Sequence, residues 1–211
     1  MDYSKILLDA YAKFLLPLGG KLVPTPYRIN IPFQIDRKKY GKSDPETLKR
    51  DVEEFAKDQS FNLEKASVEE IKQFMGKNQL GIDCSGFAYH ILNFLLNRVG
   101  KGSMLKNGFP KASRTNTEKL TSSKFSIIVD GFENAKPGDL IKMDSEEEIP
   151  HILIILSVSN EIITYAHSGK LTKIQGVHQD KIKNGKFPTE LSVYKYNEKA
   201  GDGIRRLKVL V

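Results

Sequence analysis

The residue with the clearest chemical potential is the single cysteine of the chain, Cys84. It stands at the start of residues 84–98, whose apolar side chains recur at helical spacing and predict a largely buried helix. A cysteine at a helix N-terminus lies at the positive end of the helix dipole, beside backbone N–H groups that lack helical partners. Both features stabilise a thiolate, so the pattern predicts a thiol pKa lowered toward neutrality and a nucleophilic sulfur. The alternative is an inert core cysteine.

Two of the four histidines lie where they could serve such a nucleophile. His151 opens a strand-like apolar segment, and His167 closes the next one. A hairpin that turns at Ser159, through a three-residue loop or a bulge, places the two histidines directly opposite each other on one face, about 5 Å apart. His151 is then the predicted base and His167 the group that orients it, as in other activated nucleophiles. His90 and His178 lack this placement.

Zinc binding is the rival use of one cysteine and two histidines. Cys84, His151 and His167 lie far apart in the sequence, without the CxxC or HxxxH clustering that is typical of zinc sites. We therefore expect no metal and no cofactor. A serine triad is less favoured still, because the sequence has no GxSxG nucleophile elbow.

The elements that must position these residues fall into two groups. Helical patterns come first, at residues 3–16, 44–57, from Ser67 to about Phe74, and 84–98. Strand-like segments follow, at 125–130, 138–143, 151–158, 161–167, 191–196 and 204–211. The proline-punctuated residues 21–43 indicate a loop. Helices followed by strands predict an α+β fold, in which N-terminal helices, including the nucleophile helix, pack on an antiparallel sheet of about five to six strands.

Composition sets the outer limits. The 211 residues, 39% hydrophobic and 28% charged, fit one soluble domain over 1–211. The net charge of +7 is scattered without a run of basic residues or a recognition motif, so no specific nucleic-acid partner is expected. No segment is long and apolar enough to span a membrane, and the N-terminus lacks a signal-peptide pattern. We expect a cytoplasmic protein unless a non-classical route exports it.

The chain resembles the NlpC family of papain-like cysteine peptidases, which cleave peptide stems of the bacterial cell wall. The resemblance covers about residues 77–170 and rests on four segments in order: Asp83-Cys84-Ser85-Gly86-Phe87, Ser113-Arg114-Thr115-Asn116-Thr117, Lys136-Pro137-Gly138-Asp139-Leu140-Ile141, and the His151 strand with Ala166-His167-Ser168 after it. It implies a papain-like fold with Cys84, His151 and His167 as a catalytic triad.

The resemblance also implies a substrate site. Asp83, Ser85 and Arg114 are expected to bind substrate, the first two placed to meet a free amine. The nearest analogue of the family's active-site tyrosine is Tyr27, although the tryptophan that usually accompanies that tyrosine is missing from this chain. A packed loop tyrosine is the alternative for Tyr27.

Three further expectations concern the shape of the groove. Gly86 should let a substrate backbone come close, and Leu153, in place of a family glycine, should narrow the groove. A charged helical insertion at about 44–76 separates Tyr27 from the nucleophile. Because its apolar faces are modest, we expect it to add little core and to lie beside the cleft, where it would restrict substrates.

The resemblance implies a cysteine peptidase or amidase. Its expected substrates are peptides or peptidoglycan fragments, either stem peptides or related gamma-glutamyl or D-amino-acid peptides, cleaved through an acyl-enzyme. Two other classes remain open. One is a non-catalytic module that binds wall fragments or a protein, and the other is a papain-like acyltransferase or effector.

Overall fold

The computed structural model describes residues 1–28, 41–143, 150–194 and 196–211, and this part of the chain has an α+β fold. Its α-helices are α1 (Tyr3–Ala12), α2 (Pro45–Asp58), α3 (Val68–Lys77), α4 (Cys84–Arg98) and α5 (Thr117–Thr121). Its strands are β1 (Leu15–Leu18), β2 (Lys21–Pro24), β3 (Ser126–Val129), β4 (Leu140–Met143), β5 (His151–Ser159), β6 (Ile162–Gly169), β7 (Gly176–Lys183) and β8 (Gly203–Leu207). None of the described helices is long and apolar enough to cross a membrane.

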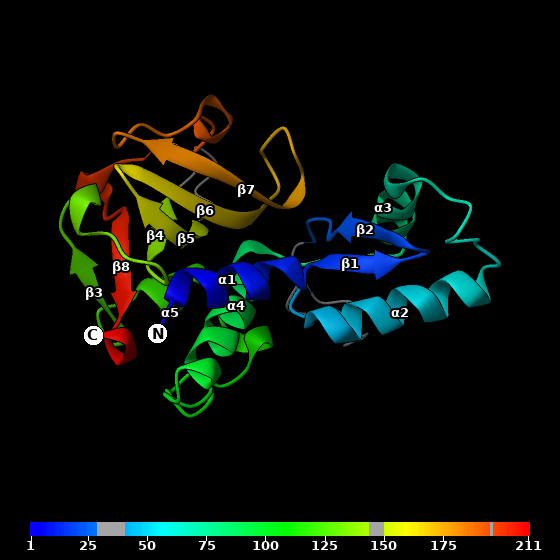
Figure 1. Ribbon diagram of the computed structural model, residues 1–211, viewed down its shortest axis with the longest axis horizontal. Coiled ribbons are helices and arrows are strands. Elements are labelled where there is room, and N and C mark those ends of the chain that lie inside the picture. Colours follow the sequence, from blue (N-terminus) through cyan, green and yellow to red (C-terminus); the bar gives the residue numbers. More distant parts are fainter. Residues whose placement is uncertain (29–40, 144–149, 195) are drawn as a thin grey trace.

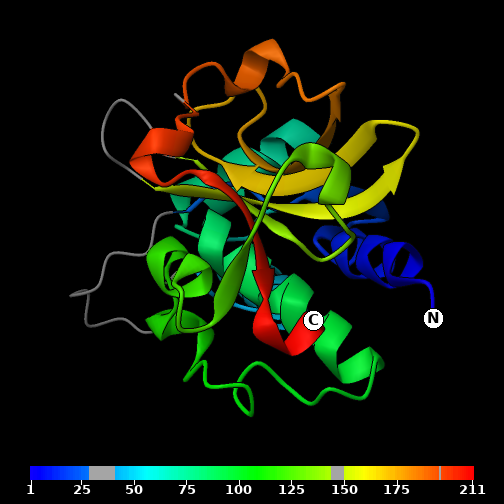
Figure 2. The same ribbon diagram turned by 90° about the vertical axis from the view of Figure 1, so that its left-hand side faces the viewer.

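The main sheet has six antiparallel strands in the order β3-β8-β4-β5-β6-β7. Helices α1 and α4 pack on one face, and residues that follow β7 cover the other face (Figures 1 and 2). Strand β5 is therefore buried on both faces, with Ile152 and Ile154 toward the helices and Leu153 and Ile155 on the opposite side. This double burial explains why its sequence is an unbroken apolar run rather than an alternating one.

A second unit lies at the far end of the molecule from β3. Strands β1 and β2 form a hairpin between α2 and α3 (Figure 1). The apolar faces of the two helices meet this hairpin and join the main core, with Leu48, Val52, Ile71 and Met75 each at most 2% exposed. The expectation that residues 44–76 add little core is wrong. Their apolar partner is residues 15–24, which sequence analysis assigned to a helix end and a loop.

Local sequence signals placed the helix starts well. Asp44 caps α2 by accepting from the Thr47 backbone N–H at 2.9 Å. Ser67 and Glu70 form a capping box at the start of α3, where the sequence predicted a helix to begin. The first helix ends at Ala12, whereas the sequence predicted a helix over residues 3–16.

The strand predictions were less accurate toward the C-terminus. Residues 191–194 and 196, which were predicted to lie in a strand, do not form one. A 3₁₀ turn, Thr189–Leu191, ends at the first of them, and the others have irregular backbone. Strand β8 stops at Leu207. Strand β7 was missed, because this edge strand is mostly polar and leaves several side chains exposed.

Candidate functional site

The nucleophile candidate begins helix α4, as predicted. Cys84 is 8% exposed, and Asp83 caps the helix by accepting from the Gly86 backbone N–H at 2.6 Å. The preceding residue, Ile82, lies between two chain segments: it pairs with Tyr27 in parallel and with Lys42 in antiparallel orientation. These pairings bring residues from both ends of the proline-rich segment to the start of α4, although 41 residues separate Lys42 from Asp83.

Three buried histidines form one hydrogen-bonded chain. His151 Nε2 lies 2.7 Å from His167 Nδ1, and His167 Nε2 lies 2.9 Å from His178 Nε2. His178 Nδ1 lies 3.0 Å from the carbonyl oxygen of Gly176, within the same strand. The expectation that His178 lacks a place beside the other two is therefore wrong. It is the direct cross-strand partner of His167 in the unrecognised strand β7.

The register of the β5–β6 hairpin differs from the predicted one. The turn consists of Asn160 and Glu161, both with positive φ (46° and 63°), which is the two-residue turn favoured in hairpins. Such a turn alone would place His151 and His167 on opposite faces. A bulge between Ile155 and Ser157 restores the shared face, so the histidines are diagonal neighbours rather than directly opposed.

His151 is held in place by its ring contacts. Its ring stacks on Tyr194, with centroids 4.2 Å apart and planes 8° from parallel. Tyr194 is 4% exposed and accepts hydrogen bonds from the backbone at Lys170 and Leu171. Stacking and the bond to His167 both restrain the ring, so the imidazole is held in one orientation.

Cys84 and His151 line one cleft of about 160 Å³. The other residues that line it are Tyr27, Asp83, Ser85, Asn116, Thr117, Glu118, Pro150, Lys170, Leu171 and Tyr194.

Four of the residues predicted for the site lie at this cleft beside Cys84, namely Tyr27, Asp83, Ser85 and His151, and His167 lies directly behind His151. Arg114 is exposed and lies outside the cleft lining. Leu153 does not narrow the groove, because it points into the core on the face of the sheet away from α4.

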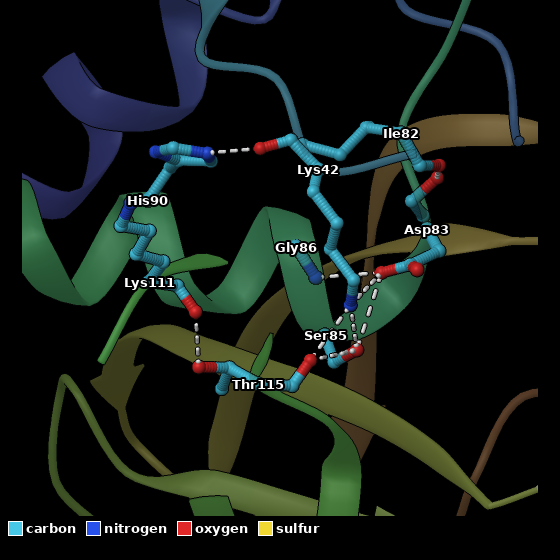
Figure 3. Close-up of polar contacts among 9 residues, drawn as sticks. Lys42, Ile82, Asp83, Ser85, Gly86, His90, Lys111 and Thr115 are labelled. Carbon is cyan, nitrogen blue, oxygen red and sulfur yellow. Dashed lines mark hydrogen bonds and ion pairs between the residues drawn. The ribbon is translucent and has the colours of Figure 1, made fainter. Parts of the chain in front are cut away.

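The sequence did not predict a buried lysine that contacts the residues on either side of Cys84 (Figure 3). Lys42 is 6% exposed, and its Nζ contacts Asp83 Oδ1 at 2.8 Å, Ser85 Oγ at 2.5 Å and the Thr115 carbonyl oxygen at 2.9 Å. Three acceptors match the three N–H groups of the ammonium. Asp83 and Ser85 are thus already bonded to an internal cation, at the place where a substrate amine was expected.

Gly86 serves packing against the chain itself rather than against substrate. A Cβ at this position would lie 2.5 Å from the carbonyl oxygen of Gly41 and 3.0 Å from the side chain of Lys42. Only glycine lets the segment that carries Lys42 approach α4 this closely. The expected role of Gly86 in admitting a substrate backbone is replaced by this one.

Burial has the largest effect on the pKa values of Cys84, His151 and His167. It raises the pKa of Cys84 to about 11, with Asp83 adding to the rise and Lys42 opposing it. Hydrogen bonds from the Ile152 backbone and the Thr117 side chain also lower the thiol pKa, but by less. Burial lowers the pKa of His151 to about 3 and that of His167 well below its ordinary value. The predicted depression of the thiol pKa is wrong, because burial and the charge of Asp83 outweigh the groups that lower this pKa.

Asp139, in the Pro-Gly-Asp segment, has a structural role. Its carboxylate binds Arg206 of β8 through two hydrogen bonds of 2.7 Å and accepts from the Lys136 backbone N–H at 2.7 Å. Gly138 supplies the positive φ of 96° that the turn requires. The segment therefore locks β4 to β8, at a distance from the cleft.

Among the described residues, no group of three or more histidine, cysteine, aspartate or glutamate side chains is arranged to hold a metal ion. Comparison of the chain with models of protein families, with curated proteins and with solved structures found no match.

Proposed function

We propose that the protein is a papain-like cysteine hydrolase that cleaves a peptide or amide bond through an acyl-enzyme on Cys84. The observation that carries this proposal is the shared cleft of Cys84 and His151, with His151 braced by His167 behind it. A nucleophile at a helix start, a base on the adjoining antiparallel sheet and a third group that orients the base is the arrangement that cysteine acyl transfer requires.

The shifted pKa values determine how the reaction would begin. With Cys84 near 11 and His151 near 3, the resting pair is a neutral thiol and a neutral imidazole. His151 takes the thiol proton as the sulfur attacks the substrate carbonyl carbon, and it gives that proton to the leaving amine when the C–N bond breaks. Water, deprotonated by the same imidazole, then releases the acid and regenerates the thiol.

Groups at the cleft can stabilise the charge that develops on the carbonyl oxygen. The backbone N–H of Cys84, in the first turn of α4, and the hydroxyl of Tyr27 are the donors we assign to this oxyanion. Burial raises the pKa of Tyr27, so its hydroxyl keeps the proton that it must donate.

The small volume of the cleft supports a short substrate segment. A cleft of about 160 Å³ accepts a short segment around the scissile bond rather than a folded partner. Peptidoglycan stem peptides and gamma-glutamyl or D-amino-acid peptides remain the substrates we propose first. Recognition of a free amine by Asp83 is not part of the proposal, because Lys42 already occupies that carboxylate.

The test is to trap the acyl-enzyme and follow its fate. The experiment compares four proteins: wild type, Cys84→Ala, His151→Gln and the matched control His90→Gln. Each is incubated with a panel of peptide esters and peptide amides, and its intact mass is measured over time. We expect a covalent adduct on Cys84 followed by free acid in the wild type and in His90→Gln only. Cys84→Ala should remain folded, because it removes one sulfur at a cost of about 1 kcal/mol.

Each alternative class predicts a different result. Transfer of the acyl group to an added amine or alcohol, without free acid, favours the acyltransferase. Binding of wall fragments without any adduct favours the non-catalytic module. Equal turnover by Cys84→Ala and wild type would refute the cysteine mechanism.

A further inference from the structure

The last member of the histidine chain ends on a group that can only accept a hydrogen bond. The carbonyl oxygen of Gly176 has no proton to give, so the 3.0 Å contact requires the proton of His178 to lie on Nδ1. In its neutral form an imidazole carries one N–H, so with the proton on Nδ1 the Nε2 atom of His178 is a lone-pair acceptor. The backbone of β7 thus assigns the tautomer of its own histidine.

The tautomer of His178 determines the tautomers of the other two histidines. His178 Nε2 accepts, so the 2.9 Å contact requires the N–H of His167 to lie on its Nε2 atom. His167 Nδ1 is then the acceptor in the 2.7 Å contact, and His151 must donate from Nε2. All three rings are at least nine-tenths buried, with exposures of 3%, 0% and 6% for His151, His167 and His178. Each ring contacts the next through one nitrogen, at a distance that requires one proton between the two atoms.

We propose that His178 is a positioning residue that, through the Gly176 carbonyl, sets the tautomer of His151 and leaves Nδ1 of that ring as its unprotonated nitrogen. This inference rests on the proposed function, since it concerns the base that serves Cys84. It extends the site to a fourth residue, His178, on a third strand, and makes a backbone carbonyl its end point.

The direction in which the three histidines donate their hydrogen bonds decides whether His151 can act as a base. With Nε2 bonded to His167, Nδ1 is the nitrogen of His151 that is left to take the thiol proton. If the chain ran in the opposite sense, His167 would donate from Nδ1 to His151 Nε2, and the single proton of His151 would move to Nδ1. Such an imidazole cannot accept a proton from Cys84 at that nitrogen, so the same three rings would form an inactive site.

The test reads the tautomer directly. In protein labelled with ¹⁵N-histidine at pH 7.5, two-bond and three-bond ¹H–¹⁵N correlations distinguish an Nε2–H ring from an Nδ1–H ring. The sequence has four histidines, so single His→Gln variants assign the signals. We expect His151 and His167 to carry the proton on Nε2 and His178 to carry it on Nδ1. A wild-type His151 protonated on Nδ1 would overturn the inference at once, whatever any variant does.

Two substitutions at one position separate hydrogen bonding from packing. His178→Gln can present an amide oxygen near the position of Nε2 and still accept from His167, whereas His178→Leu fills the space without an acceptor. In the leucine variant, the His167 proton should move to Nδ1 and the His151 proton from Nε2 to Nδ1. We expect the acylation rate of Cys84 to fall by on the order of 10²- to 10⁴-fold in that variant, the range for lost general acid–base catalysis. The glutamine variant should keep the wild-type tautomer of His151 and most of the rate.

The outcomes keep this inference separate from the proposed function. An unchanged His151 tautomer in His178→Leu would refute the positioning role even if the enzyme is active. The expected tautomers together with no acylation of Cys84 would uphold the inference about His178 and count against the hydrolase. If the leucine variant does not fold, the wild-type assignment and the glutamine variant still decide the question.

Discussion

The surroundings of Cys84 disfavour the thiolate, which is the form in which a cysteine nucleophile usually reacts. Sulfur in a buried site loses the solvation of its anion, and Asp83 beside it adds repulsion, so the thiol pKa is about 11. His151, with a pKa of about 3, is equally reluctant to become charged. In the proposed mechanism the pair is therefore neutral at rest and exchanges its proton only during attack, unlike a preformed thiolate–imidazolium pair.

Alkylation of Cys84 should follow this high pKa. The rate of reaction with iodoacetamide in the native protein should still be rising at pH 10, because the thiolate fraction grows tenfold per pH unit below the pKa of about 11. The urea-unfolded protein serves as the control, and its rate should level off above the ordinary thiol pKa of about 8.5. Labelling is followed by mass spectrometry of the single cysteine. A native rate that reaches its plateau below pH 8 would contradict the burial argument.

Among the elements, helix α4 depends on a buried ion pair at its first turn. Lys42 and Asp83 have side chains that are only 4% and 9% exposed, and they meet at 2.8 Å (Figure 3). Burial raises the pKa of Asp83, whereas the Lys42 ammonium and the Gly86 N–H lower it. The pair holds the segment that carries Lys42 against the helix start, which in turn places the sulfur of Cys84.

The stability costs of removing the two partners of this pair should not be additive. Lys42→Met leaves a buried carboxylate without its cation and should cost about 3–5 kcal/mol of unfolding free energy. Asp83→Asn keeps a side chain that can cap the helix, and the double variant should cost clearly less than the sum of the two single changes. Urea unfolding of all four proteins measures the coupling.

An exposed pair provides the matched control. Lys13 and Glu46 meet at 3.3 Å, with side chains 43% and 70% exposed. Lys13→Met should change the unfolding free energy by less than about 1 kcal/mol, because solvent screens such pairs. Additive costs at Lys42 and Asp83 would show that the buried pair does not act as a unit.

Across the whole molecule, the histidine chain links stability to pH. His151 and His167 are neutral in the folded protein and have lowered pKa values, whereas an unfolded histidine has a pKa near 6.5. Below pH 6.5 the unfolded chain binds protons that the folded protein does not, so acid favours unfolding. This stability is fully present above about pH 6.5 and is lost as the pH falls toward the folded value of about 3.

The expected slope is about 1.4 kcal/mol per pH unit for each such histidine between pH 6 and 4. Urea unfolding at a series of pH values measures it, and His151→Gln should give a shallower dependence than the wild type. The comparison of the two curves removes the contribution of carboxylates, which both proteins share. Parallel curves would mean that His151 is not held neutral by burial.

The sequence by itself determined the features that short-range physics controls. Caps at Asp44 and Ser67 begin two helices, since each cap bonds a backbone N–H only three residues away. Apolar periodicity identified α4 and the β5–β6 hairpin, and with them Cys84, His151 and His167. Each of these signals lies within a single segment of the chain.

Only the tertiary structure decided which segments meet and how far the site is buried from solvent. Tyr27 reaches the cleft and Lys42 reaches Asp83 because both residues pair with Ile82. His178 joins the other histidines because a polar edge strand pairs with β6. A single bulge in β5 decided whether His151 and His167 share a face. Burial, which no single segment encodes, reversed the predicted direction of the pKa of Cys84, because the cost of desolvating a charge depends on everything that is packed around it.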